Sequence, residues 1–485
     1  MKSAYNLLRL SICALLLCGS LAASATHYLS GTITYRHIQA NQYAVQVVLY
    51  TDYVTSSGQP SADEPETVLH CLPNLEAGCA DALQNEVTVR IPRQRFELIS
   101  AQCGALTVRK NFYTALITLP PNRWTLLVDN VNRRGGIVNI SNSVATTGTI
   151  ATTLDNSTGL VNNSAEFIST EIPSLNGNQY HRLTARAIDV DGDSVAYEFV
   201  TPQQGLSARS CPRPADGFFQ PPHFRLDAVT GVLETVPFTL VQGHYVTTIQ
   251  ANEFRRLNGG WTKIGSVQHD FMYLVRSVST ANSNPRFSAL QRGNATLDFA
   301  RPIPVNPGQT VELTLTATDP DAGQQLTFSS LTPMLYSALY PSASFPTIQK
   351  LSATQARLTW QVPASLPVGR YQFGLAVTDD FCQQYGQEIR PITFVVTNQV
   401  IAGTKRAADR AMEAYPTPFH EQVRFQLSQP GSQTLHVFDG LGRTLAQLTS
   451  RPDGSVLWQP VPTLPAGLYL ARTADGQQQV RLLRE

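Results

Sequence analysis

The segment Pro363–Tyr371 reads P-A-S-L-P-V-G-R-Y, leads directly into Q-F-G-L-A-V-T, and decides the fold of this chain. After the turn, apolar residues occupy every second position, at Tyr371, Phe373, Leu375 and Val377. Because side chains alternate between the two faces of a strand, this period of two buries one face in a core. Gly369 permits the tight turn, and Tyr371 anchors the start of the strand. The segment predicts a turn that re-enters a β-sandwich.

The same pattern occurs earlier in the chain. Pro237–Tyr245 reads P-F-T-L-V-Q-G-H-Y, which repeats P-x-x-L-x-x-G-x-Y at a distance of 126 residues. An acidic turn repeats in the same order, as A-I-D-V-D-G-D over Ala187–Asp193 and as T-D-P-D-A-G over Thr318–Gly323, with the first aspartates 130 residues apart. Two landmarks at nearly one period predict two copies of one domain.

Each copy resembles an immunoglobulin- or cadherin-like β-sandwich of about 100 residues. Copy one also contains F-R-L-D-A-V-T-G-V-L over Phe224–Leu233, which is similar to a hairpin of cadherin-like domains. We place copy one at 166–283 and copy two at 284–398. The expected fold class is all-β, with tandem Ig/cadherin-like β-sandwiches and a small C-terminal β-sandwich.

Residues 26–165 are also rich in strand patterns and are predicted to form an N-terminal β-domain. Tyr43, Val45, Val47 and Leu49 alternate with the residues between them, as in the second strand of a hairpin. The run H-x-x-x-G-x-I-T-Y from His27, followed by Y-x-V-x-V-x-L-Y-x-D from Tyr43, resembles the first domain of large surface proteins of Bacteroidota.

The tail of the chain, 411–485, carries three short motifs in order. They are Y-P-T-P-F from Tyr415, D-G-L-G-R from Asp439 and L-P-A-G-L-Y from Leu464. This tail resembles the type A C-terminal sorting domain of proteins exported by the type IX secretion system of Bacteroidota. The chain departs from the family pattern at Thr417, where asparagine is usual, and at the acidic last residue, Glu485.

The resemblance implies an export address, and it implies the type IX secretion machinery as a partner. Residues 399–410 are predicted to be a linker that leaves the tail accessible. The sorting-motif residues implied by the resemblance are Tyr415, Pro416, Pro418, Phe419, Asp439, Gly442, Arg443, Pro465, Gly467 and Tyr469.

The first 25 residues are predicted to be a signal peptide. Lys2 and Arg9 precede the apolar stretch from Leu10 to Ala23, and Ala23-Ser24-Ala25 is a small-residue cleavage sequence. A lipoprotein interpretation through Cys18 is disfavoured, because Leu17 stands where a small residue is needed. No later run reaches the ~18 apolar residues of a membrane helix. The expected location is secreted, or the outer-membrane surface of a Gram-negative bacterium.

Five cysteines remain after the signal peptide: Cys71, Cys79, Cys103, Cys211 and Cys382. An oxidising exterior favours disulfides, and a Cys71–Cys79 bridge would close the shortest loop. Cys103 is an alternative partner for either residue. An odd number leaves at least one thiol outside any internal bridge.

Calcium is the sharpest chemical prediction. Asp189, Asp191 and Asp193 alternate through one tight turn, where carboxylates can converge on a cation that takes six to eight oxygens. Copy two offers Asp319 and Asp321, with Asp379 and Asp380 as possible additional ligands. The alternative is a turn in which aspartate side chains cap backbone amides.

Neither the charge nor the motifs indicate an enzyme or a nucleic-acid partner. The chain has 36 basic and 35 acidic residues and no basic stripe. None of its nine histidines belongs to a catalytic motif. We therefore predict a non-enzymatic protein for adhesion, matrix contact or display. The alternative is a carbohydrate-binding or accessory protein of a surface polysaccharide system, with Trp261 and Phe254 as an aromatic platform if they are not core residues. A third hypothesis is a hydrolase site within 26–165.

Overall fold

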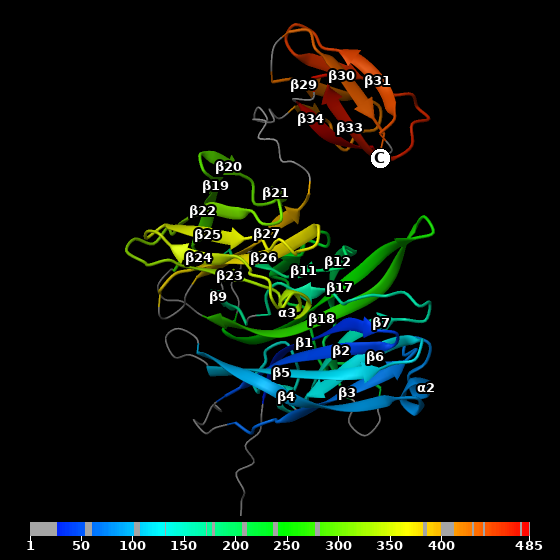
Figure 1. Cartoon of the computed structure of the whole chain (residues 1–485), viewed down its shortest axis with the longest axis vertical. Helices are drawn as coiled ribbons and strands as arrows, with labels where there is room; N and C mark the ends of the chain where they lie inside the picture. The colour runs from blue at the N-terminus through cyan, green and yellow to red at the C-terminus, as the bar shows by residue number, and fades with distance from the viewer. Residues whose placement is uncertain are drawn as a thin grey trace, which may run out of the picture. The chain divides into compact units, whose positions relative to one another are not determined.

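The computed structural model describes residues 27–53, 61–100, 107–130, 132–170, 172–176, 180–205, 211–235, 241–276, 282–381, 386–398, 412–428, 431–439, 442–475 and 478–484. The predicted signal peptide and linker lie outside these residues. The chain forms two compact units, Met1–Val400 and Ile401–Glu485, and the division falls within the predicted linker. Figure 1 shows that strands dominate both units, which confirms the all-β class.

The N-terminal block forms one antiparallel sheet in the order β1-β2-β5-β4-β3-β6-β7. Alternate residues of these strands, among them Tyr35, Val45 and Leu126, fill a core on its inner face. A short helix, α2 (Cys79–Gln84), follows β3, and the turn η1 (Ser143–Ala145) precedes β7. The strands are β1 (Tyr28–Gln39), β2 (Gln42–Asp52), β3 (Glu66–Pro73), β4 (Val87–Ser100), β5 (Thr107–Thr118), β6 (Arg123–Asn130) and β7 (Gly148–Asp155).

Copy one is a sandwich with its own core, between the small sheet β10-β16-β15 and a layer built on the long hairpin β17–β18. β8 pairs with β11, and the short strands β13 and β14 extend the N-terminal sheet beyond β7. The strands are β8 (Glu166–Phe167), β9 (Ser174–Asn176), β10 (Arg182–Thr184), β11 (Ala187–Ile188), β12 (Ser194–Val200), β13 (Gln203–Gln204), β14 (Arg213–Pro214), β15 (Phe224–Leu226), β16 (Val232–Thr235), β17 (Gly243–Leu257) and β18 (Gly260–Arg276).

Strand β18 belongs to both the N-terminal block and copy one, so the predicted division at residue 165 into separate domains is wrong. One edge of β18 pairs with β17. The other edge pairs with β7 at Gly265–Val267 and with β1 at His269–Phe271. The N-terminal sheet therefore curls until its first and last strands meet along β18. Alternation predicts which face of a strand is buried, but it carries no information about the partner on each edge.

A buried ion pair fixes this seam. Arg133 donates from Nη1 and Nη2 to the two carboxylate oxygens of Asp270 at 2.8 and 2.9 Å, and Thr248 donates to the same carboxylate at 2.9 Å. The Arg133 and Asp270 side chains are 1% and 0% exposed. Burial alone would lower the pKa of Arg133, but the charge and hydrogen bonds of Asp270 raise it. A buried pair of this kind destabilises the fold strongly when one partner is removed.

Copy two is a complete sandwich, as predicted. Its sheets run β20-β19-β22-β25-β24 and β21-β27-β26-β23, and they enclose Trp360, Phe373 and Phe394. Its elements are β19 (Arg286–Arg292), β20 (Ala295–Leu297), β21 (Ile303–Val305), β22 (Thr310–Thr318), β23 (Thr327–Leu331), α3 (Met334–Leu339), β24 (Thr347–Lys350), β25 (Gln355–Gln361), β26 (Gly369–Thr378) and β27 (Gln387–Val396).

The two copies pack tightly against each other. Ile168 and Ile188 of copy one belong to the core of copy two. The fully buried carboxylate of Glu166 accepts the first amides of α3, from Met334 at 2.7 Å and from Leu335 at 2.6 Å. Burial raises the pKa of Glu166 to about 7. The junction is therefore a fixed contact with buried polar anchors.

The turn that repeats in the sequence makes the same hydrogen bond in each copy. The hydroxyl of Tyr245 donates to the carbonyl of Val241 at 2.8 Å, and that of Tyr371 donates to Pro367 at 2.9 Å. Tyr469 of the second unit donates to Pro465 in the same way, and the indole of Trp124 donates to Pro120 at 2.8 Å. In all four cases, the aromatic side chain donates to the backbone carbonyl four residues earlier and so closes the turn.

The second unit is a small sandwich of the sheets β28-β29-β32 and β31-β30-β33-β34, as predicted. Phe419 is buried in its core, while Tyr415 is 80% exposed. The peptide bonds before Pro416 and Pro418 are cis. The strands are β28 (Glu413–Tyr415), β29 (Val423–Gln426), β30 (Thr434–Phe438), β31 (Thr444–Thr449), β32 (Ser455–Trp458), β33 (Gly467–Thr473) and β34 (Gln479–Arg484).

The D-x-x-G-R motif lies between β30 and β31, and its first, fourth and fifth residues are among those described. Asp439 accepts the backbone amide of Arg443 at 2.9 Å and its Nε at 2.7 Å. Gly442 has a φ of 80°, which glycine adopts without strain. The hydroxyl oxygen of Thr417, which replaces the usual asparagine, accepts the amide of Leu483 at 3.3 Å.

The predicted Cys71–Cys79 disulfide is wrong. Cys79, at the start of α2, is bonded to Cys211, 132 residues away, with a Cα–Cα distance of 5.9 Å. Cys71 is a free thiol in the core of the N-terminal sheet, where burial raises its pKa to about 12. Because side chains alternate along β3, Cys71 lies in the inner core, whereas its neighbour Leu72 packs against Ala82 of α2 on the other face. Cys103 and Cys382 lie outside the described residues.

Replacing Cys79 or Cys211 by serine should lower the free energy of unfolding by about 5 kcal/mol, because the bridge closes a long loop of the unfolded chain. Chemical denaturation of the oxidised protein and of each variant measures this. Non-reducing peptide mapping should recover the Cys79–Cys211 pair, and Cys71 should react with an alkylating agent only after unfolding. A Cys71–Cys79 peptide would contradict the assignment.

Candidate metal sites at two aspartate turns

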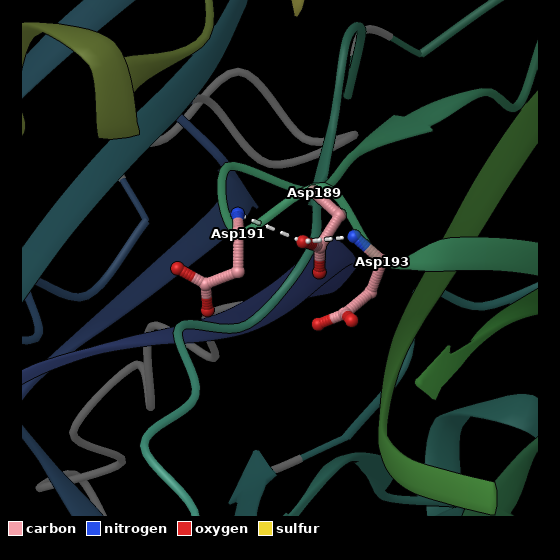
Figure 2. Close-up of side chains that lie close together, drawn as sticks. All are labelled: Asp189, Asp191 and Asp193. Atoms are coloured by element: carbon pink, nitrogen blue, oxygen red, sulfur yellow. Dashed lines mark hydrogen bonds between the residues drawn. The ribbon is translucent and has the colours of Figure 1, made fainter. Parts of the chain in front are cut away.

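The first aspartate turn connects β11 to β12. Figure 2 shows Asp189, Asp191 and Asp193 gathered around it, and one carboxylate oxygen of each lies within 4.8 Å of the others. Asp189 Oδ1 accepts the amides of Asp191 and Asp193 at 2.9 and 3.0 Å. The turn thus uses one aspartate to cap its backbone, which was the alternative to metal binding, and still brings three carboxylates together.

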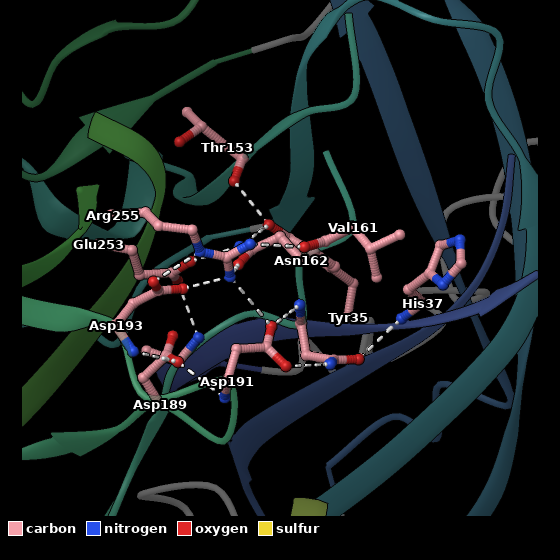
Figure 3. A network of polar contacts seen from close by, with 12 residues as sticks. Tyr35, His37, Thr153, Val161, Asn162, Asp189, Asp191, Asp193, Glu253 and Arg255 are labelled. Carbon is pink, nitrogen blue, oxygen red and sulfur yellow. Dashed lines mark hydrogen bonds and ion pairs between the residues drawn. The ribbon is translucent and has the colours of Figure 1, made fainter. Parts of the chain in front are cut away.

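Arginine and asparagine side chains surround this cluster (Figure 3). Arg255, on β17, donates to the two oxygens of Asp193 at 2.7 and 2.5 Å, and its Nη2 lies 3.5 Å from Asp191 Oδ2. Asn163 donates its backbone and side-chain N–H groups to Asp191 at 2.7 and 2.8 Å. Two of the three carboxylates therefore already have strong donors.

Behind the turn lies a buried carboxyl group. Glu253, also on β17, is 0% exposed and accepts Asn162 Nδ2 at 2.7 Å and the amide of Ala165 at 2.8 Å. Burial, followed by the charge of Asp189, raises the pKa of Glu253 to about 8. Burial and the neighbouring aspartates raise the pKa of Asp189 to about 7. These raised pKa values reduce the negative charge of the cluster at neutral pH, and Arg255 balances much of what remains.

The first turn fits a calcium ion only in part. Asp189 Oδ2 is buried and has no hydrogen-bond partner among the described residues, so one oxygen is available to a hard cation. However, Arg255 holds both oxygens of Asp193, and a cation would have to displace that guanidinium. Arg255 thus takes the place that a cation would occupy in this turn.

The second turn, between β22 and β23, repeats the capping hydrogen bond without the arginine. Asp319 Oδ1 accepts the amide of Asp321 at 2.8 Å, and Asp321 Oδ2 accepts the amide of Ser283 from the segment that joins the copies. Asp319 Oδ2 is buried and has no partner in the described part of the chain. Burial and the charges of Asp321 and Asp380 raise the pKa of Asp319, although the amide of Asp321 opposes this.

The junction adds further oxygens beside the second turn. Asp379 Oδ2 accepts Asn282 Nδ2 at 2.9 Å and the amide of Gly386 at 2.8 Å, and burial raises the pKa of Asp379 to about 6. A Cβ at Gly386 would lie 2.6 Å from Asp379 Oδ2 and 2.8 Å from Asn284 Oδ1, so these two oxygens face the same point. Asn284 is 6% exposed, and its Oδ1 has no partner within the described ranges.

The donor set of the second turn fits calcium better than that of the first. Three of its buried oxygens lack a hydrogen-bond donor among the described residues: Asp319 Oδ2, Asn284 Oδ1 and Gln324 Oε1. No described ion pair involves any of its four aspartates. Only the first turn brings three carboxylates within 4.8 Å of one another. The second turn still fits calcium better. A buried oxygen without a hydrogen-bond partner costs free energy, whereas carboxylates that lie too far apart can move closer when an ion binds.

The sequence pattern predicts the aspartates but not the residues that distinguish the two turns. Arg255 lies 62 residues after Asp193, and only strand pairing brings them together. Asn282 and Asn284 lie in a polar segment, N-S-N, whose composition predicts no more than a connection. The three partnerless oxygens are visible only in three dimensions.

The N-terminal block offers little to the hydrolase hypothesis. His70 Nδ1 contacts Glu86, but the neighbouring Cys71 thiol lies inside the core with a raised pKa, so it is a poor nucleophile. Asp63 pairs with Arg93 and Arg109, and its hydrogen bonds to Arg93 lower its pKa, which is unsuited to a general acid.

Trp261 is not a core residue, a point that the sequence left open. It lies near the tip of the β17–β18 hairpin and is 65% exposed, opposite Arg256. Phe254, lower on the same hairpin, is only partly exposed. An exposed indole at a hairpin tip gives a ligand a flat apolar face with a hydrogen-bond donor at its edge.

No protein-family profile and no curated protein matches the chain. Among solved structures, the chain is similar to extracellular cadherin domains 3–6 of protocadherin gamma B2, with 13% identity over 66% of this chain and 73% of that chain and a TM-score of 0.18. It is similar to domains EC1-2 of human protocadherin-24, with 13% identity over 49% and 99% and a TM-score of 0.16. It is similar to extracellular domains 3–5 of Drosophila OTK, with 10% identity over 73% and 91% and a TM-score of 0.15. The fold assignment rests on strand pairing and cores rather than on these similarities.

Within the described residues, no helix is both long and apolar enough to span a bilayer.

Replacing Arg255 by methionine should lower the free energy of unfolding by about 3 kcal/mol, because it leaves clustered carboxylates without their cation. Added calcium should recover part of that loss, because the ion can then enter the turn. Thermal melts with calcium and with chelator measure both effects. Arg256→Met, at the exposed neighbouring position, is the matched control and should change little. An Arg255→Met protein as stable as wild type in chelator would contradict the charge argument.

Proposed function

We propose that this protein is a non-enzymatic adhesion, matrix-contact or display protein of the cell exterior, exported by a signal peptide and then by the type IX secretion system. The observation that carries this proposal is the junction between the two sandwiches. Glu166 anchors α3 across it, residues of copy one belong to the core of copy two, and Asn284 Oδ1 of the joining segment has no hydrogen-bond donor among the described residues. Such a junction suits a protein whose two sandwiches must keep their relative orientation when force is applied. A calcium ion bound beside it would make the junction more rigid.

Calcium is proposed to bind mainly at the second turn, through Asp319, Asp321, Asp379 and Asn284. The ion would supply the positive charge that the described residues do not provide there. At the first turn Arg255 already supplies much of it, so the site at Asp189, Asp191 and Asp193 is proposed to bind calcium more weakly.

A second candidate function is carbohydrate binding at a surface polysaccharide. The exposed indole of Trp261 favours this function. The ring faces solvent and does not contribute to the core, so it is available to contact a sugar ring.

Calcium should raise the melting temperature of the wild-type protein, and Asp319→Asn should remove the rise while Asp191→Asn retains most of it. At a free calcium concentration of about 100 times Kd, the expected stabilisation is about 2.7 kcal/mol. Differential scanning calorimetry with calcium and with chelator measures the shift. Melting curves that coincide under the two conditions would end the calcium proposal.

Surface display should fall when Tyr415 is replaced by alanine, while the melting temperature of the second unit stays unchanged. Tyr415 is the sorting-motif aromatic that faces solvent, so it is free to be recognised, whereas Phe419 and Tyr469 are needed for folding. Protease accessibility on intact producing cells measures display. Val461→Ala, at an exposed apolar position of the same unit, is the control. Normal display of a chain that ends at residue 398 would refute the sorting role.

Attachment of the producing cells tests the adhesion proposal itself. Deleting the gene should abolish specific attachment to a surface, and the secreted protein added back should compete with wild-type cells. Unchanged attachment of the deletion strain would contradict adhesion and leave display or carbohydrate binding.

A further inference from the structure

A positively lined cleft of about 600 Å³ lies where copy one meets copy two. One wall comes from β10, β15 and β16, and the other comes from β26, β27 and the segment after β20. The cleft is independent of both aspartate turns, because none of its lining residues belongs to either of them.

Arginines dominate the charge of this cleft. Its lining includes five arginines and three carboxylates. Two arginines are balanced, since Arg182 pairs with Glu234 at 2.9 Å and Arg390 pairs with Glu388 at 2.8 Å. The other three are Arg186, Arg225 and Arg370, and none of them takes part in an ion pair among the described residues.

The remaining carboxylates of the lining are occupied in their own turns. Asp227 Oδ1 accepts the amides of Val229 and Thr230, both at 2.9 Å. Asp298 Oδ1 accepts the amide of Ala300 at 2.9 Å. Both aspartates keep their negative charge, but neither forms an ion pair with Arg186, Arg225 or Arg370 among the described residues. Arg225 and Arg370 are exposed, and Arg186 is partly buried.

Arg186 is held in place despite a like charge nearby. Its Nε donates to Gln372 Oε1 at 3.1 Å, across the junction between the copies. Burial lowers the pKa of Arg186, and the charge of Arg370 lowers it further. Both arginines line the cleft, so an anion bound there would offset this unfavourable interaction between like charges.

The cleft also has an apolar part. Leu226, Phe299 and Pro391 line it, and the Arg390 guanidinium lies 5.1 Å from the centroid of the Phe299 ring. Guanidinium groups bind carboxylate and sulfate oxygens through paired N–H donors, and the apolar residues offer contact to a carbon skeleton. This combination suits a ligand that carries both anionic groups and apolar faces.

We propose that this cleft binds a segment of an acidic polysaccharide through Arg186, Arg225 and Arg370. The proposal rests on the second candidate function, carbohydrate binding, and specifies its ligand class as a glycan bearing carboxylates or sulfate esters. An acidic peptide is less suitable, because a peptide that adds to a sheet needs a long open edge, and the copy-one strands that line the cleft have only three or four residues each.

Binding of the full-length secreted protein to polygalacturonate, dextran sulfate, neutral dextran and polyglutamate tests this. Isothermal titration calorimetry at several salt concentrations should show binding to one or both anionic glycans that weakens as salt rises. Tighter binding to polygalacturonate identifies carboxylates as the ligand groups, and tighter binding to dextran sulfate identifies sulfate esters. Binding to neither anionic glycan, or equal binding to neutral dextran, overturns the proposal. Tighter binding to polyglutamate replaces the glycan with an acidic peptide.

The double variant Arg225→Gln/Arg370→Gln locates the site. It should weaken binding of the preferred anionic glycan by about tenfold or more, since one charge-assisted hydrogen bond already corresponds to about tenfold. Arg357→Gln/Arg424→Gln removes two exposed arginines outside the cleft and should leave affinity within about twofold. Equal losses in the two double variants overturn the site assignment. If Trp261→Ala abolishes binding while the cleft variant retains it, carbohydrate binding stands and the cleft is excluded.

Discussion

The pairing of Arg133 with Asp270 is the constraint on which the first unit depends. It fixes β18 at the point where the two ends of the N-terminal sheet meet. Since β17 pairs with β18 along its full length, the same constraint sets the position of Glu253 and Arg255. β17 carries Arg255 and therefore sets the charge balance of the first aspartate turn. β17 is held by β18, which the buried Arg133–Asp270 pair fixes in place. Fold and candidate site share one structural cause.

Periodicity predicted what depends on one strand at a time. The alternation from Tyr371 to Val377, the repeated turns and the three-motif tail all correspond to observed strands and corners. It failed where two distant segments must be paired. The division at residue 165 ignored β18, which serves two sheets, and the choice of Cys71 over Cys211 followed loop length, whereas the fold turns Cys71 into the core. Edge partners and disulfide partners are properties of topology, which a single sequence encodes only indirectly.

The repeated aromatic corner changes how the tail should be interpreted. Leu-Pro-Val-Gly-Arg-Tyr in copy two and Leu-Pro-Ala-Gly-Leu-Tyr in the tail make the same hydrogen bond from tyrosine to the carbonyl four residues earlier. That motif is thus a device for closing a sandwich, and it is not specific to a sorting domain. The specific part of the resemblance is carried by the solvent-facing Tyr415 and by the Asp439–Arg443 turn, which explains why Tyr415 is the informative residue to replace.

The two aspartate turns show how one local structure acquires different chemistry from its surroundings. Both cap their backbone with the first aspartate, at 2.9 Å in copy one and 2.8 Å in copy two. In copy one, β17 brings Arg255 to the remaining carboxylates, and the charge is largely balanced within the chain. In copy two, the neighbouring segment contributes Asn282 and Asn284 instead. Asn282 donates an N–H group to Asp379, but Asp319 Oδ2 and Asn284 Oδ1 have no hydrogen-bond donor among the described residues. A bound calcium ion stabilises a carboxylate cluster most where no ion pair among the described residues already neutralises it. The second turn has fewer aspartates than the first, and it is nevertheless the stronger candidate for calcium.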